Sequence, residues 1–132
     1  MKWFLPRLKL FGKQDIGYKV NTYEVRFEFL IFFEVSRSKM IRLFELVKTR
    51  RRVKEKFDDI EKDEFEVPNM SNFYPVLLLK LKNVFKKIEL EVRQKKHENF
   101  KIVFSTIKKV VFKKQTNGNY LVRIDVEGDC VT

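Results

Sequence analysis

Several residue types are rare or missing in this chain of 132 residues, and each absence excludes a kind of site. Alanine is absent, Cys130 is the only cysteine and His97 is the only histidine. A single cysteine cannot form an internal disulfide, which favours a reducing, intracellular environment and leaves only an intermolecular bridge through Cys130. A structural zinc site takes about four cysteine or histidine ligands, so the sequence excludes one.

Glycine and proline are scarce as well, with four and three residues. The sequence has no glycine-rich phosphate loop, nucleophile elbow or pair of metal-binding histidines, so we predict neither an enzyme nor a bound cofactor. Codons for alanine, glycine and proline are GC-rich, whereas those for the abundant lysine and phenylalanine are AT-rich. This composition is typical of an AT-rich genome, such as that of a virus or a mobile element.

Long apolar runs are also missing. The longest uncharged apolar run covers residues 29–33, far short of the roughly 20 residues of a transmembrane helix. Residues 1–11 are basic and apolar, but they lack the continuous apolar core and cleavage site of a signal peptide. They have the composition of an interfacial anchor, yet Pro6 interrupts any helix there, so binding to a membrane surface is not favoured. We expect a soluble, intracellular protein.

The apolar material that the chain does contain is sufficient for a core. Hydrophobic residues make up 44% of the sequence, and 14 of them are phenylalanines. The length fits one domain. We expect residues 1–17 to form an N-terminal arm or edge strand, and residues 18–132 to form a single α+β domain.

Residues 18–35 show the clearest β pattern, because Tyr23, Val25, Phe27 and Phe29 alternate with charged residues. This predicts one long N-terminal strand. A helix is predicted over residues 38–60, with Ser38 as its N-cap. The apolar residues of that helix fall on one stripe, formed by Leu43, Leu46, Val53, Phe57 and Ile60.

Residues 76–86 fit two structures. Leu77, Leu79 and Leu81 alternate with lysines, as in a strand, whereas Leu77, Leu81, Val84 and Ile88 have helical spacing. We favour the strand.

Residues 87–127 are predicted to form antiparallel strands in a meander. In its second strand Phe100, Ile102 and Phe104 would share the apolar face, and Asn117-Gly118 predicts a hairpin before the last strand. The expected fold is therefore α+β: a single antiparallel β-sheet, made of the long N-terminal strand and the C-terminal meander, with one long helix packed on it.

Charge is the most distinctive property of the sequence. The formal net charge is +11, but residues 58–66 contain six acids and one lysine, which leaves +16 on the remainder. A surface this basic attracts polyanions, and nucleic acid is the partner that we predict. Binding would be independent of sequence, since phosphate contacts supply most non-specific affinity.

Two groups of cations are candidates for phosphate contact. One is the cluster at residues 48–56. The other is a set on the predicted meander that would make a basic sheet surface: Lys86, Lys87, Arg93, Lys95, Lys96, Lys101, Lys108, Lys109, Lys113 and Lys114. The alternative is that both are ordinary solvated surfaces of a lysine-rich protein. The predicted nucleic-acid-binding residues are Lys48, Arg50, Arg51, Arg52, Lys54, Lys56, Lys95, Lys96, Lys108 and Lys109.

Two other functions compete with this one. The acidic segment 58–66 of one copy could dock on a basic face of another, which would make the chain a self-associating structural protein and a homo-oligomer. Carboxylates on a sheet face could also hold Mg²⁺, as in metal-dependent nucleases, although cross-strand pairing with cations explains them more simply. Those carboxylates are Glu89, Glu91, Asp125, Glu127 and Asp129.

Overall fold

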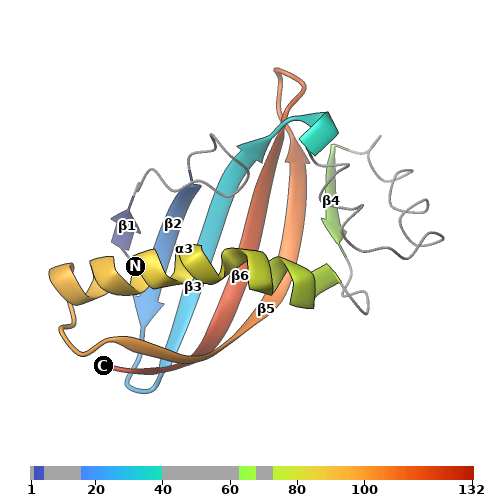
Figure 1. The fold of residues 1–132 in the computed structure, drawn as a ribbon. Coiled ribbons are helices and arrows are strands. Elements are labelled where there is room, and N and C mark those ends of the chain that lie inside the picture. Colours follow the sequence, from blue (N-terminus) through green and yellow to red (C-terminus); the bar gives the residue numbers. More distant parts are fainter. Residues whose placement is uncertain (1, 5–15, 40–62, 68–72) are drawn as a thin grey trace.

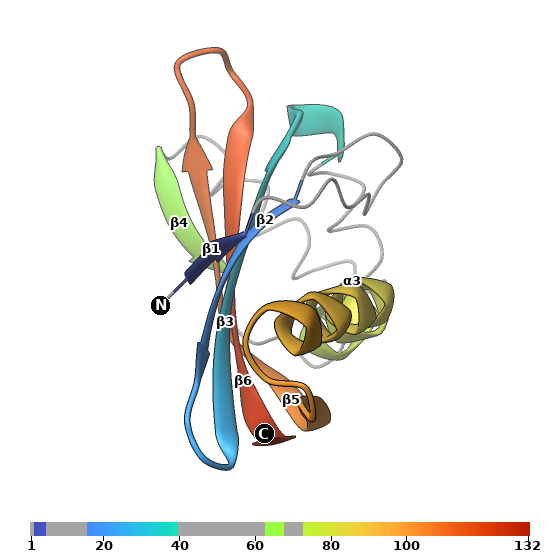
Figure 2. The same ribbon diagram turned by 90° about the vertical axis from the view of Figure 1, so that its left-hand side faces the viewer.

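A computed structural model of the chain describes residues 2–4, 16–39, 63–67 and 73–132. Within them, six strands form one antiparallel sheet in the order β1-β2-β3-β6-β5-β4. Helix α3 lies across one face of this sheet (Figure 1, Figure 2). The predicted α+β class with a single antiparallel sheet is confirmed, but the described helix packed on the sheet is α3 and not the helix predicted over residues 38–60. The elements are β1 (Lys2–Phe4), β2 (Ile16–Thr22), β3 (Arg26–Val35), β4 (Glu64–Val67), α3 (Phe73–Lys95), β5 (Lys101–Lys114) and β6 (Tyr120–Val131).

The long strand predicted over residues 18–35 is wrong, because the chain forms a hairpin there. β2 and β3 pair antiparallel, and the amide of Tyr23 donates to the carbonyl of Arg26 at 2.7 Å across the turn. The turn residues Glu24 and Val25 have none of the glycine, proline or asparagine that usually marks a turn. Tyr23 and Val25 are 52% and 65% exposed, so they leave the apolar face on which alternation had placed them.

Two other N-terminal predictions fall partly outside the described residues. Of the predicted arm, residues 2–4 form β1 at the sheet edge, and residues 5–15 are not described. Of the helix predicted over residues 38–60, only its first residues are described, and residues 40–62 are not. The N-cap is Ser36 rather than Ser38, because the Ser36 hydroxyl accepts a hydrogen bond from the amide of Lys39 at 3.3 Å.

The strand favoured over residues 76–86 is also wrong, since this region belongs to α3. Its buried apolar residues recur every three or four positions, which is the spacing of a helix and not of a strand. They are Leu77, Leu81, Val84, Ile88 and Val92. Leu79 and Leu90 interrupt the predicted alternation, because they are 62% and 53% exposed on the other side of the helix. Pro75 lies in the first turn of α3, where its missing amide hydrogen costs nothing. The meander therefore begins at β5, not at residue 87.

The apolar core lies between α3 and the facing side of the sheet. Alternate residues of β3 and β6 point into it, and register pairs Phe29 with Val126 and Ile31 with Ile124. The last strand of the predicted meander is thus confirmed. So is the hairpin before it, where Gly118 has a φ of 86° and its amide donates to the carbonyl of Gln115 at 3.1 Å.

Phe104 does not share the face of Phe100 and Ile102, and it is 58% exposed. Two register shifts in β5, at Val103 and at Lys108, each insert one extra residue opposite β6. Each insertion reverses the alternation of the residues that follow. β5 also approaches β6 closely here, because a Cβ on Gly128 would lie 1.8 Å from the carbonyl oxygen of Phe104. Only glycine fits at that position.

Candidate nucleic-acid interface

The solvent-exposed side of α3 has exposed lysines and no exposed acid. We call this side the outer face of α3. The outer face has no exposed acidic residue, because Glu89 and Glu91, the only acids of α3, are half-buried at the flanks of the helix. The exposed side chains of the outer face are Leu79, Lys80, Lys82, Asn83, Lys86, Lys87, Leu90 and Gln94.

The two acids of α3 bind groups of the sheet and of the helix itself. The hydroxyl of Tyr18 on β2 donates a hydrogen bond to the carboxylate of Glu91. Burial and this contact with Glu91 raise the pKa of the Tyr18 hydroxyl well above its ordinary value. Glu89 accepts hydrogen bonds from the guanidinium of Arg93 and from the amide of Ile102, both at 2.9 Å. The charge of Glu89 is paired with that of Arg93, whereas Glu91 keeps its negative charge at the flank of the helix, because the Tyr18 hydroxyl is neutral.

The C-terminal end of α3 is fixed to the sheet on two sides. The Nε atom of Arg93 donates to the carbonyl of Phe100 at 2.6 Å, which ties the helix to the segment before β5. The hydroxyl of Thr22, at the end of β2, lies 3.1 Å from Nε2 of His97 in the turn after the helix. These contacts hold the outer face in one orientation relative to the sheet.

The predicted site residues do not form one surface. Lys95 and Lys96 are exposed where α3 ends. Lys108 and Lys109 lie on β5, and Lys109 stands opposite Asp125 on the sheet face that α3 does not cover. We call that side the open face of the sheet. The other six predicted residues, Lys48, Arg50, Arg51, Arg52, Lys54 and Lys56, are outside the described part of the chain.

The lysines of the outer face were missed as a site because residues 76–95 were assigned to strands. Lys86 and Lys87 had been placed on a basic sheet surface, and Lys80 and Lys82 had not been singled out. The helical spacing from Leu77 to Ile88 was the signal that could have grouped all four.

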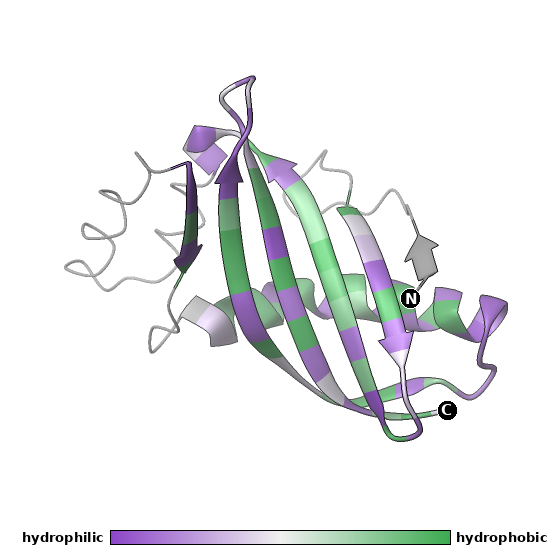
Figure 3. Cartoon of the chain, turned by 180° about the vertical axis from the view of Figure 1, so that it is seen from behind, coloured by the Kyte–Doolittle hydropathy of each residue, from purple (hydrophilic) through white to green (hydrophobic). Residues whose placement is uncertain are grey.

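Hydrophilic residues alternate with apolar ones along the strands of the open face (Figure 3). Their charges are of both signs on neighbouring strands. Glu127 lies 3.6 Å from Arg26 and 3.7 Å from Lys108, and Arg123 lies 3.4 Å from Asp125. Because these cations have acidic neighbours, the predicted basic sheet surface is wrong for this part of the meander. The reason is that cross-strand neighbours on an exposed face pair most favourably as opposite charges.

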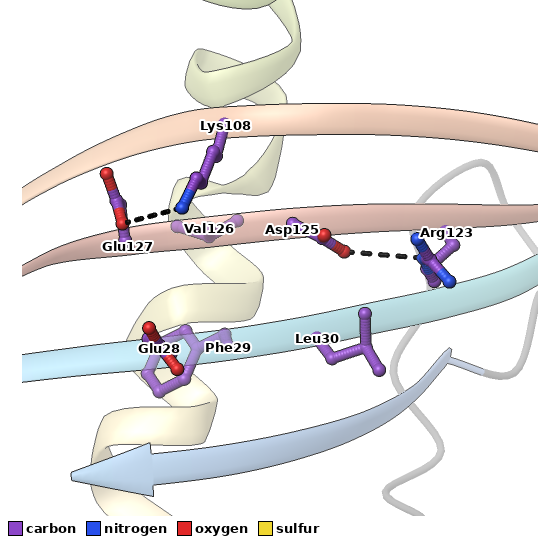
Figure 4. Close-up of a pocket in the computed structure, with 8 residues that line it drawn as sticks. All are labelled: Glu28, Phe29, Leu30, Lys108, Arg123, Asp125, Val126 and Glu127. Carbon is purple, nitrogen blue, oxygen red and sulfur yellow. Dashed lines mark ion pairs between the residues drawn. The ribbon is translucent and has the colours of Figure 1, made fainter. Parts of the chain in front are cut away.

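A hollow of about 330 Å³ lies at the centre of the open face (Figure 4). Leu30 on β3 contributes apolar surface and lies opposite Asp125 of β6. Register places Glu28 directly opposite Glu127, which is a like-charge pair. The Oδ1 atom of Asp125 is buried there and accepts no hydrogen bond within the described part of the chain; its neighbour is Arg123. The lining residues are Glu28, Phe29, Leu30, Lys108, Arg123, Asp125, Val126 and Glu127.

The five carboxylates considered for Mg²⁺ do not meet on one sheet face. Glu89 and Glu91 belong to α3, whereas Asp125, Glu127 and Asp129 belong to β6 and line up on the open face. Among the described residues, no group of three acidic, histidine or cysteine side chains is arranged to hold a metal ion.

Cys130 is buried, with 4% of its surface exposed. Burial, and to a smaller degree the charge of Asp129, raises the pKa of its thiol. An intermolecular disulfide through Cys130 would therefore require the end of β6 to open.

In the described part of the chain, no helix is long and apolar enough to cross a membrane. Comparison with known proteins finds no matching family model, no matching curated protein and no matching solved structure.

Proposed function

We propose that this chain is a small, non-enzymatic nucleic-acid-binding protein that holds the phosphate backbone through the outer face of α3. The observation that supports the proposal is the contrast in charge between the two exposed surfaces. Among the described residues, the exposed side chains of the outer face include four lysines and no acid, whereas cations on the open face have acidic neighbours. A one-signed surface attracts a polyanion, and each neutralised phosphate releases a counterion.

Lysine suits a partner recognised by charge rather than by sequence. Its ammonium group is a flexible point charge without the fixed geometry of an arginine fork. Lys95, the last residue of α3, and Lys96 after it are further exposed cations at the C-terminal end of the helix. The cluster at residues 48–56, with Arg50, Arg51 and Arg52, is a further phosphate-binding region in this proposal and lies outside the described residues.

The test is the salt dependence of binding to a labelled DNA duplex of about 20 base pairs, measured by fluorescence anisotropy. The variant Lys82→Gln/Lys86→Gln/Lys87→Gln should bind more weakly than wild type. Its slope of log affinity against log salt should be smaller by up to about 3, near 0.9 for each lost contact. Replacing Arg50, Arg51 and Arg52 by alanine tests the second region in the same way.

The matched control removes the same charge from β5, with Lys109→Gln/Lys113→Gln/Lys114→Gln. We expect its slope to stay close to that of wild type. A larger loss in this control than in the α3 variant would move the binding surface to the sheet. Absence of binding by wild type at low salt would disprove the proposal.

Self-association through the acidic segment 58–66 is the alternative. Its described residues are 63–66, and residues 64–66 belong to β4, which pairs with β5 of the same chain. Register puts Glu64 opposite Lys113. Cations of the same chain thus already face part of this segment. Light scattering at two salt concentrations separates the two functions, because an electrostatic oligomer would dissociate in high salt.

A further inference from the structure

Side chains on the outer face of α3 are arranged in three parallel lines. Leu79, Asn83 and Leu90 fall within about 40° of one line along the helix, at 3.6 residues per turn. They form an uncharged ridge, and both leucines are more than half exposed.

Lysines flank this ridge on both sides. Lys80 and Lys87 are displaced from Asn83 by about 40–60° in one direction, and Lys82 and Lys86 by about 60–100° in the other. All four side chains are exposed. The helix therefore presents two lysine pairs with a narrow uncharged strip between them.

We infer that the outer face of α3 enters the major groove of B-form DNA, with one lysine pair on each phosphate backbone and the ridge toward the base edges. This inference rests on the proposed function and names its partner. An α-helix with its side chains is about 10–12 Å wide, and the major groove is about 12 Å wide. A groove has a phosphate strand along each border, which matches cations on two sides of a ridge.

The side chains of the ridge can make the contacts that base edges on the floor of the major groove offer. The Asn83 amide can donate and accept hydrogen bonds at the edge of adenine, and the leucines can contact thymine methyl groups. Contacts this few give at most a modest preference for A·T-containing sites, so binding remains nearly independent of sequence.

Two other nucleic acids fit the outer face less well. Single-stranded binding surfaces use exposed aromatic side chains for base stacking, and the outer face as described has none. The major groove of an A-form RNA duplex is too deep and narrow for side chains to read. Double-stranded DNA is therefore the expected partner.

The experiment compares four labelled probes at one salt concentration: a DNA duplex of about 20 base pairs, an RNA duplex of the same sequence, single-stranded DNA and anionic phospholipid vesicles. Wild type should bind the DNA duplex about tenfold more tightly than the RNA duplex. Asn83→Glu should weaken binding to the DNA duplex by about tenfold or more, because it places a carboxylate against the groove floor. The control Thr116→Glu makes the same change of charge at the exposed β5–β6 hairpin and should cost about twofold or less. Thermal unfolding of both variants checks that the fold is kept.

Failure of this inference and failure of the proposed function give different results. Equal affinity for both duplexes, with Asn83→Glu no weaker than Thr116→Glu, would overturn groove insertion and leave salt-dependent phosphate binding intact. Tighter binding to vesicles than to any nucleic acid would overturn both.

Discussion

The two faces of the sheet are built from the same strands, yet one is buried beneath α3 and the other is open and charged. On β3, Phe27, Phe29 and Ile31 are buried beneath α3, while Glu28 and Leu30 between them line the open face. One face is closed by apolar packing, and the other carries charges of both signs. The difference shows that alternation along a strand determines which residues share a face, but not what covers that face.

The largest expected difference between the faces is in packing energy. Ile31→Ala should lower the free energy of unfolding by about 2–5 kcal/mol, because it opens a cavity in a fully buried position. Leu30→Ala, one residue along on the open face, should cost only about 1 kcal/mol, since Leu30 is partly exposed. Urea denaturation of the two variants measures both values, and equal losses would mean that the open face is as well covered as the other.

The next effect is a pH dependence confined to the face beneath α3. Burial, with the Glu91 contact, raises the pKa of Tyr18 above its ordinary value of 10.0. Above pH 10 the unfolded chain loses this proton while the folded chain keeps it, so stability falls as pH rises. Each pH unit above 10 should cost up to about 1.4 kcal/mol from this group.

Tyr18→Phe removes that contribution. Between pH 10 and 11 its stability should fall less steeply than that of wild type, although it starts about 1 kcal/mol lower at pH 8 because a hydrogen bond is lost. Tyr23→Phe, at an exposed tyrosine in the turn, is the control and should follow wild type. If the free energy of unfolding falls equally with pH in wild type and Tyr18→Phe, the raised pKa of Tyr18 is contradicted.

The smallest effect belongs to the open face. Glu28→Gln should raise the free energy of unfolding by up to about 0.5 kcal/mol at low salt, because it removes a directly opposed pair of like charges. Glu127→Gln removes the same repulsion but also the two ion pairs with Arg26 and Lys108, so it should gain less or lose stability. High salt should shrink the difference between the two variants.

The regions predicted well from the sequence are those where one local signal dominates. β6 alternates without interruption, and Asn117-Gly118 supplies the positive φ that its hairpin requires. The β2–β3 turn has no such signal, because the alternation runs through Glu24 and Val25 as though the strand continued. Single extra residues in β5, such as Val103, change which face Phe104 occupies without altering the composition of the segment.

Only part of the candidate site follows from the sequence. The excess of basic charge is a property of the composition, and its use for phosphate contact stays a prediction, but the surface that displays the charge depends on whether residues 76–95 form a strand or a helix. Lysines at positions 80, 82, 86 and 87 would have been divided between two sides of a strand. On α3 they share one side, a difference that only the helical spacing of the buried residues reveals.

The irregular course of β5 also governs how the sheet ends. β4 pairs only with Val110–Lys113. In the described part of the chain, the first nine residues of β5 therefore have a strand neighbour on the β6 side only, and their other side is an edge of the sheet. An edge of that length is a template for strands of other copies and so invites aggregation. The extra residues Val103 and Lys108 break the regular spacing of the backbone groups along this edge. The Glu89 carboxylate also accepts a hydrogen bond from the amide of Ile102. The bulges that turn Phe104 outward thus also protect the edge from a second molecule.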